Sequence, residues 1–288
     1  MTTRLAARHV TTYRYQEPAL QCQNHVRLTP RHSPRQQVIE SSLEIDPEPE
    51  PVRTHIDYFG NVVQSFRVNR EHTKLVIIAT SVADLTPLPP IEFAATPPWE
   101  RLQGLIEDDH SDESFEAAQF LYDSPRIRRS ATLAEFARPI FTPKRPVLEA
   151  ALELSRRVYK EFKYDAESTD VDTPVEAALA RRTGVCQDFA HVMAGCLRSL
   201  GVPARYVSGY LKSSPKFVGT EASHAWVSVF CPGLGWVDFD PTNNLVPSVD
   251  HVTLAWGRDY GDVPPVKGIT LGGGEQEIEV GVGVTQEP

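Results

Sequence analysis

The sequence has few cysteines, no long apolar run and no excess of positive charge. Its 288 residues include four cysteines, at positions 22, 186, 196 and 231, and none of them shows the CxxC spacing of a zinc site or a redox pair. Such isolated cysteines argue against a disulfide framework. We therefore expect a reducing, cytoplasmic setting, which would also keep a catalytic thiol reduced.

The missing features also limit the partners of the chain. A net charge of −9 lacks the basic surface that nucleic acids and anionic membranes require. No stretch approaches the run of about 20 apolar residues that spans a bilayer. The N-terminus shows no apolar segment of the kind found in secretory signals. We expect a globular protein with neither a nucleic-acid nor a membrane partner.

Residues 1–84 are rich in strand patterns, with β-branched and aromatic residues alternating with polar ones. Gly60-Asn61 between two such stretches indicates a hairpin turn. Strands at this spacing, with no helical pattern between them, predict an antiparallel β-sandwich domain. The histidines of this region are scattered, so we expect no metal site there; they are His9, His25, His32, His55 and His72.

Residues 85–144 predict a connector that is dense in proline at first and helical in short pieces afterwards. An acidic run at 107–113 within it is typical of a solvated loop before a helix. Residues 147–162 then show a strong helical periodicity. This helix opens a second domain, for which we take residues 145–260.

A second helix carries the most informative cysteine. Phe189, Val192, Met193 and Cys196 recur at helical spacing, and Gly201 lies where a C-terminal cap belongs. Cys186 therefore falls in the first helical turn. Free backbone N–H groups and the positive end of the helix dipole favour an anion there, and a thiolate is such an anion.

A hairpin downstream carries the two groups that such a thiolate needs. Residues 223–230 and 236–240 are both strand-like, and the stretch 232–235 between them contains proline and glycine. His224 and Asp240, at the open ends of this hairpin, should be neighbours. A nucleophile, a base and a carboxylate that orients the base are the components of acyl-transfer catalysis.

Five blocks of the sequence resemble the bacterial branch of the transglutaminase-like cysteine enzymes. In chain order the blocks are Gly184-Val-Cys186-Gln-Asp-Phe-Ala, Leu200-Gly-Val-Pro-Ala-Arg205-Tyr-Val-Ser-Gly209-Tyr, His224-Ala-Trp226, Gly235-Trp236 and Asp240-Pro-Thr242. The resemblance covers residues 145–245 and implies an α+β protein with a papain-like, transglutaminase-type catalytic core behind the N-terminal sandwich. By this resemblance, Cys186 is the nucleophile, His224 the general base and acid, and Asp240 the orienting carboxylate.

The resemblance also implies hydrolysis of a peptide or isopeptide bond in a peptide or protein substrate, through a thioester and without a cofactor. Transfer to an amine, as in a protein-glutamine gamma-glutamyltransferase, stays open, as do a silent scaffold of the same fold and a metal-dependent hydrolase. No acidic run has calcium-loop spacing. Residues 261–288 include a last strand, which we expect to pack on the catalytic domain.

Further residues are assigned around the three catalytic candidates. Tyr164 or Gln187 could supply a second oxyanion donor beside the backbone N–H of Cys186. Trp226 and Trp236 could form walls of the cleft. Asp238 shares a strand face with Asp240 and is its rival for the orienting role.

Overall fold

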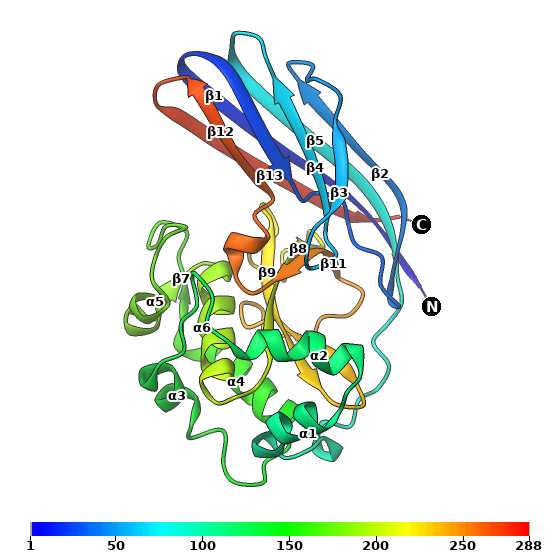
Figure 1. Cartoon of the computed structure of the whole chain (residues 1–288), viewed down its shortest axis with the longest axis vertical. Coiled ribbons are helices and arrows are strands. Elements are labelled where there is room, and N and C mark those ends of the chain that lie inside the picture. The colour runs from blue at the N-terminus through cyan, green and yellow to red at the C-terminus, as the bar shows by residue number, and fades with distance from the viewer. Residues whose placement is uncertain (1, 288) are drawn as a thin grey trace.

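The computed structural model describes residues 2–287, and its upper lobe in Figure 1 is built from the two ends of the chain. This lobe is a seven-stranded antiparallel sheet in which β2, β5, β1, β4 and β3 are adjacent in that order, and β12 and β13 pair with β1. Its strands are β1 (Thr3–Val26), β2 (Gln36–Asp46), β3 (Arg53–Ile56), β4 (Val62–Val68), β5 (His72–Leu85), β12 (Val266–Gly272) and β13 (Gln276–Gln286).

The sheet is bent across its middle. The first half of β1 pairs with β5 and β13, and its second half pairs with β4 and β12. Figure 1 shows the strands turning over at the top of the lobe. Side chains from both halves, among them Cys22, Phe66 and Ile77, form one apolar cluster. The predicted sandwich is therefore a single hydrogen-bonded sheet that folds over its own core, rather than two separate sheets.

The C-terminal strand was predicted to pack on the catalytic domain, but most of its length pairs with β1 of the N-terminal lobe. Eleven residue pairs join β13 to β1, from Leu5 opposite Gln286 to Tyr15 opposite Gln276. The physical reason is that β1 would otherwise present an open edge of unpaired N–H and C=O groups, which β12 and β13 satisfy. Towards its end the strand also contacts the catalytic domain, through backbone bonds to Ser213 and Glu221 and through Val284, which is buried in the apolar cluster that contains Tyr210 of β8.

The connector between the two lobes is helical in short pieces, as predicted. Ser111 and Ser130 cap two of these helices, because their hydroxyls accept the N–H groups of Ser114 and Leu133. The pieces are the 3₁₀ turns Phe93–Ala95, Trp99–Arg101 and Gln119–Leu121 and the helices α1 (Leu102–Asp108), α2 (Asp112–Ala118) and α3 (Ala131–Ala137).

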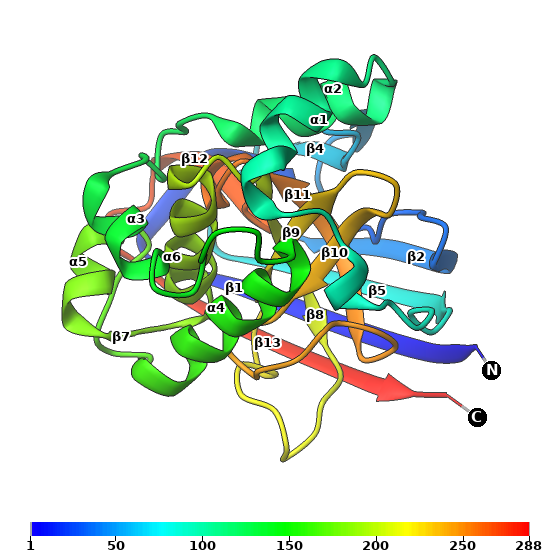
Figure 2. The same ribbon diagram turned by 90° about the horizontal axis from the view of Figure 1, so that it is seen from below.

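The lower lobe packs helices against a four-stranded antiparallel sheet with the order β10-β9-β8-β11. Figure 2 shows α4 and α6 side by side, with α3 and α5 beyond them and the sheet on the opposite side. The elements are α4 (Val147–Glu161), β6 (Lys163–Tyr164), α5 (Val175–Arg181), β7 (Thr183–Gly184), α6 (Cys186–Ser199), β8 (Ala204–Leu211), β9 (His224–Cys231), β10 (Gly235–Phe239), β11 (His251–Gly257) and the 3₁₀ turn Tyr260–Asp262.

Helix α6 is the buried centre of this lobe. It begins at Cys186, as predicted, and Gly201 follows its end with a φ of 78°, where glycine avoids the strain that a side chain would create. Residues 186–198 are all buried, since α3, α4 and α5 pack around the helix and β8 and β9 lie across it. A helix enclosed on all sides holds its first residue in a fixed place. Within residues 2–287, no helix has the length and apolarity to cross a membrane.

Candidate active site

Cys186 is the first residue of α6 and lies next to the start of β9. Its side chain is 8% exposed, and its thiol donates toward the carbonyl oxygen of Ser223 at 3.9 Å. Ser223 immediately precedes His224, so the helix tip and the strand meet at this point. The thiol is free, as are the three other cysteines. Asp188 caps the helix by accepting the N–H of Val185 at 2.8 Å.

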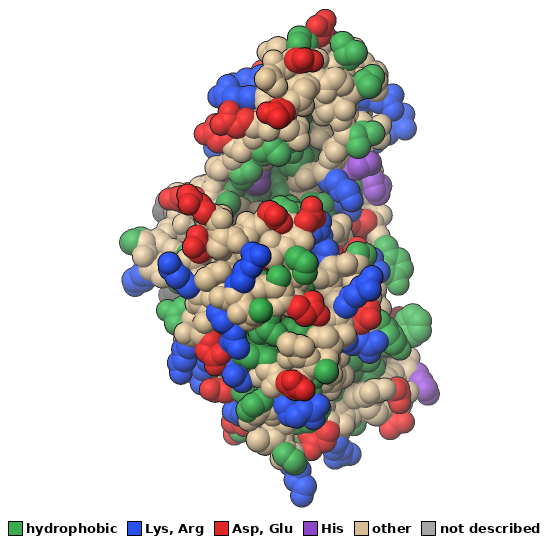
Figure 3. Space-filling model, turned by 90° about the vertical axis from the view of Figure 1, so that its left-hand side faces the viewer, with side chains coloured by type: hydrophobic (Ala, Val, Ile, Leu, Met, Phe, Trp, Pro, Cys, Tyr) green, Lys and Arg blue, Asp and Glu red, His purple; other side chains and the backbone are tan. Residues whose placement is uncertain are grey.

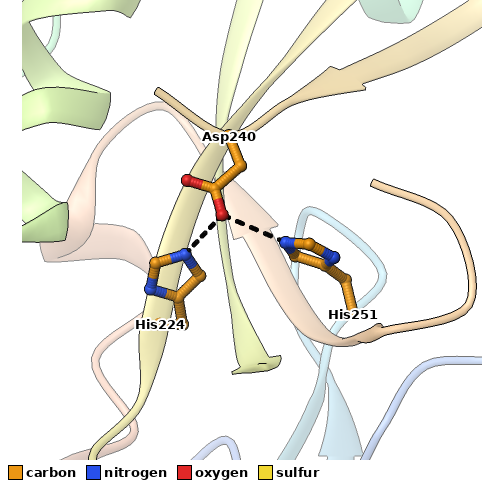
Figure 4. A group of neighbouring side chains, drawn as sticks. All are labelled: His224, Asp240 and His251. Atoms are coloured by element: carbon orange, nitrogen blue, oxygen red, sulfur yellow. Dashed lines mark hydrogen bonds and ion pairs between the residues drawn. The ribbon is translucent and has the colours of Figure 1, made fainter. Parts of the chain in front are cut away.

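His224 and Asp240 come together as the hairpin predicted. β9 and β10 pair from Val227 opposite Phe239 to Cys231 opposite Gly235, which leaves His224 and Asp240 at the open end. The Nε2 atom of His224 lies 2.8 Å from Oδ2 of Asp240, and both side chains are fully buried. Figure 4 shows the imidazole directed at the carboxylate. Asp240 rather than Asp238 therefore contacts the histidine.

The carboxylate of Asp240 accepts five hydrogen bonds. Its Oδ1 accepts the backbone N–H groups of Thr242 and Asn243 at 2.8 and 3.1 Å, which fixes the turn after β10. Its Oδ2 accepts Nε2 of His224, Nε2 of His251 and Nδ2 of Asn243. Burial alone would raise the pKa of Asp240, but the charge of His224 and these hydrogen bonds hold that pKa below its usual value.

The same pair decides the charge of His224. Burial disfavours an imidazolium, but Asp240 and, to a smaller extent, the Cys186 side chain outweigh it and raise the pKa of His224 to about 10. The cationic ring is therefore the favoured form at neutral pH. With Nε2 committed to Asp240, the Nδ1 atom has no hydrogen-bond partner among residues 2–287 and is the atom available for proton transfer.

His251 is a part of the site that the sequence did not predict. It begins β11, and its Nε2 donates to the same Oδ2 of Asp240 at 3.1 Å, so that the two rings approach one oxygen from different sides (Figure 4). Trp226 packs beside both imidazoles, with its ring centre 5.2 Å from that of His251 and 6.1 Å from that of His224. No local motif surrounds His251, and only the pairing of β11 with β8 brings it here.

Tyr164 and Gln187, the two candidates for a second oxyanion donor, lie in different environments. Tyr164 lies at the site: a Cβ placed on Gly219 would be 3.2 Å from Nδ1 of His224 and 3.6 Å from the Tyr164 hydroxyl. Burial, with the charges of Cys186 and Glu221, raises the pKa of Tyr164 to about 12, so its hydroxyl keeps its proton. The Nε2 amide of Gln187 instead donates to the carbonyl of Val171 at 3.1 Å.

The two tryptophans lie in different places, and only Trp226 is at the site. Trp226 is completely buried behind the histidines, where it keeps water from the ion pair. Trp236 was expected near the site and is not there. It lies opposite Phe230 at the closed end of the hairpin and packs on Phe120. A tryptophan four residues before Asp240 in a strand is too far along the chain to reach the carboxylate.

A loop tied to the N-terminal lobe covers His224. Residues 212–222 bring Gly219, with a φ of 79°, over Nδ1 of the ring. At the two ends of this loop Ser213 and Glu221 exchange backbone bonds with Val284 and Val282 of β13 at 2.9 Å. Figure 3 shows the surface hollowed between the two lobes, with hydrophobic side chains in the hollow and acidic ones below it. The catalytic candidates thus lie in a nearly closed site beside the junction of the lobes.

His224, Asp240 and His251 are also the one group within residues 2–287 whose donor atoms are close enough to share a metal ion. Two imidazoles and a carboxylate are chemically suitable for zinc. Here, however, both Nε2 atoms donate to the carboxylate at hydrogen-bonding distance, and a metal would require both protons to leave. The arrangement accounts for all three groups as a hydrogen-bonded unit.

Comparisons with known proteins agree with this geometry. The model of the transglutaminase-like superfamily matches residues 134–241, and that of the bacterial transglutaminase-like N-terminal region matches residues 5–84. The uncharacterised protein Rv2569c of Mycobacterium tuberculosis is 37% identical over 96% of this chain and 90% of its own length. This chain belongs to the transglutaminase-like superfamily. Cys186, His224 and Asp240 all fall inside the matched core, whereas His251 lies beyond it.

Other relatives extend the comparison. The uncharacterised protein ML0607 of Mycobacterium leprae is 35% identical over 98% of this chain and 99% of its own. A protein-glutamine gamma-glutamyltransferase of Pseudomonas aeruginosa is 30% identical over 44% of this chain and 20% of its own. The crystal structure of a candidate cysteine protease from Cytophaga hutchinsonii covers 99% of this chain and 91% of its own, with a TM-score of 0.79 at 22% identity. The papain-like, transglutaminase-type fold is thereby confirmed.

Proposed function

We propose that this protein is a cysteine-dependent acyl-transfer enzyme that hydrolyses a peptide or isopeptide bond through a thioester. The observation that carries the proposal is the buried His224–Asp240 pair beside a cysteine at the N-terminus of α6. A cationic imidazole favours a thiolate on Cys186, and a thiolate is the reactive form of cysteine. Membership of the transglutaminase-like superfamily supports the same reading.

The reaction follows from the free atoms of these side chains. The Cys186 thiolate attacks the amide carbonyl carbon, and Nδ1–H of His224 protonates the departing amine, which leaves a thioester and a neutral ring. His224 then removes a proton from a water molecule while the oxygen of that water attacks the thioester carbonyl carbon. The carbon–sulfur bond breaks, which releases the acid product and restores the Cys186 thiolate and the protonated ring. Asp240 holds Nε2–H throughout, so that Nδ1 always faces the reacting atoms.

Two donors are suited to the oxyanion of this reaction. Cys186 is the first residue of α6, so its backbone N–H has no acceptor within the helix and lies at the positive end of the dipole. The hydroxyl of Tyr164 is the second, because it lies near the ring of His224 and keeps its proton. Preorganised donors of this kind stabilise the transition state without reorganising. Gln187 is the weaker candidate, since its amide holds the 171 loop.

A second function is transfer of the acyl group to a primary amine instead of water. The observation that favours it is the similarity to the gamma-glutamyltransferase of Pseudomonas aeruginosa, which spans 135 aligned residues. Nothing in the three catalytic candidates chooses between water and an amine, because both attack the same thioester. Incubating the protein with a glutamine peptide and a labelled amine separates the two: incorporation of the label supports transfer, and conversion of the glutamine to a glutamate of the peptide, with release of ammonia, supports hydrolysis.

The test of the proposal is covalent labelling of Cys186 followed by a search for its substrate. A thiol-reactive amide probe should label the parent protein at Cys186 and should fail to label Cys186→Ala. Cys196→Ala is the matched control, since Cys196 lies ten residues further on the same helix and burial raises the pKa of its thiol. Mass spectrometry of the acyl-enzyme trapped from a cell extract then identifies the acyl donor.

The same experiment separates the rival functions. A scaffold of this fold predicts no labelling of the parent protein and no acyl-enzyme. A hydrolase using a metal at His224, Asp240 and His251 predicts loss of activity with a chelator and indifference to iodoacetamide, and we expect the opposite pattern. The cytoplasmic location and the absence of nucleic-acid and membrane partners stay predictions.

A further inference from the structure

A cavity of about 400 Å³ lies on the other side of His251 from Asp240, between the two lobes. It is bounded by residues 33–36 of the N-terminal lobe, by helix α2 and by the outward face of the catalytic sheet. Its size falls in the range of small-molecule sites. Neither Cys186 nor His224 is among the residues that line it, so it is separate from the candidate active site.

The most unusual group in the cavity is Arg205 of β8. Its side chain is stacked between two indole rings, 4.2 Å from the centre of Trp236 and 3.7 Å from that of Trp256, and only 7% of the residue is exposed. Its Nε–H has no acceptor among residues 2–287. Asp238, Glu116 and Glu113 interact with the guanidinium of Arg205 through their charges. Within residues 2–287, however, no carboxylate lies within ion-pair distance of it. The guanidinium is thus held between two indole rings, and its Nε–H lacks an acceptor.

Such an arrangement is unfavourable in the protein alone. Burying a charged donor without an acceptor costs free energy, and here burial lowers the pKa of Arg205 to about 9 despite the nearby acidic groups. The planar guanidinium offers paired N–H groups that match a carboxylate in a bidentate contact. Because the two indoles fix the plane of the fork, a carboxylate entering the cavity would bind with little loss of side-chain freedom.

The other charged side chains of the cavity indicate what a ligand should carry besides a carboxylate. Asp238, Glu113 and Glu116 line it together with Arg35. A plain anion bound to Arg205 would meet three carboxylates, and a plain cation would leave Arg205 unsatisfied. A molecule that carries one carboxylate and one ammonium group satisfies both sets of charges at once.

His251 gives the cavity a second unsatisfied group. The residue is 5% exposed and lines the cavity, and its Nδ1 has no partner among residues 2–287, while its Nε2 is bound to Asp240. A ligand in the cavity would therefore be one side chain away from the catalytic carboxylate.

We propose that this cavity is a binding site for a small zwitterion of the amino-acid type, with its carboxylate on Arg205 and its ammonium group toward Asp238 and Glu116. The site does not depend on catalysis, so it is tested by binding alone. Glycine, L-alanine, L-glutamine and L-lysine are titrated into the parent protein by calorimetry and repeated with Cys186→Ala. Acetate, methylamine and inorganic phosphate serve as probes that carry only one kind of charge.

At least one amino acid should bind both proteins equally and raise their thermal midpoint, and acetate or methylamine should bind at least about tenfold more weakly, since each offers half of the contacts. Arg205→Gln should weaken amino-acid binding about tenfold or more. Arg31→Gln is the matched control, because Arg31 stacks on Trp256 at 3.4 Å but does not line the cavity.

If Arg205→Gln fails to fold, Glu116→Gln on the exposed side of α2 replaces it as the test of the ammonium end, with the same expected direction. The proposal is overturned if no amino acid binds at millimolar concentration, if phosphate binds more tightly than any amino acid, or if Arg205→Gln and Glu116→Gln both leave the affinity unchanged. Binding that survives in Cys186→Ala supports the cavity even if the proposed acyl transfer fails.

Discussion

Asp240 accepts the same kind of hydrogen bond from His224 and from His251, but the two histidines have different surroundings. On one side His224 donates Nε2–H to Oδ2 at 2.8 Å, and on the other His251 does so at 3.1 Å. Both rings are buried, and neither Nδ1 has a partner among residues 2–287. The Nδ1 of His224 is close to Gly219 and Tyr164, whereas His251 lines the cavity that contains Arg205. The role of a histidine here is therefore set by the surroundings of its second nitrogen.

The comparison also shows why a carboxylate is required between the rings. Asp240 is fully enclosed, so its charge interacts strongly with whichever ring is protonated. An imidazolium at His224 lies next to Cys186, where it can favour the thiolate and donate a proton to the leaving amine. On the His251 side the same bond holds the carboxylate in place. We infer that His224 is catalytic and that His251 is a positioning residue.

Asp240→Asn removes the shared partner and should have the largest effect. An amide can accept from only one ring and donates elsewhere, so His224 loses both its charge partner and its orientation. Cleavage of a peptide nitroanilide should fall by about 10⁴-fold, as for loss of an orienting carboxylate. The exposed Asp250→Asn is the control and should change the rate less than about twofold. A loss of less than tenfold in Asp240→Asn would contradict the assignment.

Tyr164→Phe tests the His224 side alone and should have the next largest effect. Removing one oxyanion donor lowers turnover by about 10²-fold. The rate of Cys186 alkylation by iodoacetamide should stay within about twofold, because this reaction forms no oxyanion. Parallel losses in both rates would instead assign Tyr164 to the packing of the site.

His251→Gln tests the other side and should lower turnover by roughly tenfold. Glutamine can keep a donor near Oδ2, so the carboxylate stays charged and bound to His224, but its position is less fixed. The loss should appear in kcat with KM unchanged, and His251→Asn should rescue less than glutamine. A loss equal to that of His224→Gln would show that the two sides are equivalent and would end the distinction drawn here.

The free energy of unfolding should depend on pH through the protonation of His224. Of the effects predicted here, this one is the smallest. The folded pKa of His224 is about 10, above the ordinary value of 6.5, so its contribution is complete below pH 6.5 and is lost between pH 6.5 and 10. In a Cys186→Ala background no thiol titrates at this position, and the loss should end below pH 10, because the Cys186 side chain adds to the raised pKa of His224. The slope should reach at most about 1.4 kcal/mol per pH unit. Urea unfolding of this protein with and without His224→Gln measures it, and identical slopes would contradict the raised pKa.

The sequence predicted the His224 side well and the His251 side not at all. Cys186, His224 and Asp240 lie in short elements whose local patterns predict both their type and their ends. The hairpin was enough to predict the contact between His224 and Asp240, and the helix pattern was enough to place Cys186 at the first turn of α6. His251 joins them through the pairing of β11 with β8, a contact between strands 40 residues apart. No local pattern encodes such a pairing.

The N-terminal lobe shows the same limit on a larger scale. Its strands were predicted from alternation, but alternation does not show where the sheet folds over its own core, which is where the pairing of β1 with β5 is interrupted between Arg14 and Ala19. The placement of β12 and β13 depends on the open edge of β1, which only the assembled sheet reveals. Trp236 was misplaced because its block belongs to the family pattern, although its position in the strand points it toward Arg205.

The most direct test of the account is the rate of Cys186 alkylation by iodoacetamide at pH 7, followed by mass spectrometry in the parent protein and in His224→Gln. The account predicts that the parent reacts at least about tenfold faster than the variant, because a neighbouring imidazolium favours the thiolate, which is the reactive form of cysteine. Equal rates in the two proteins would contradict the pairing of Cys186 with His224 on which the proposed chemistry depends.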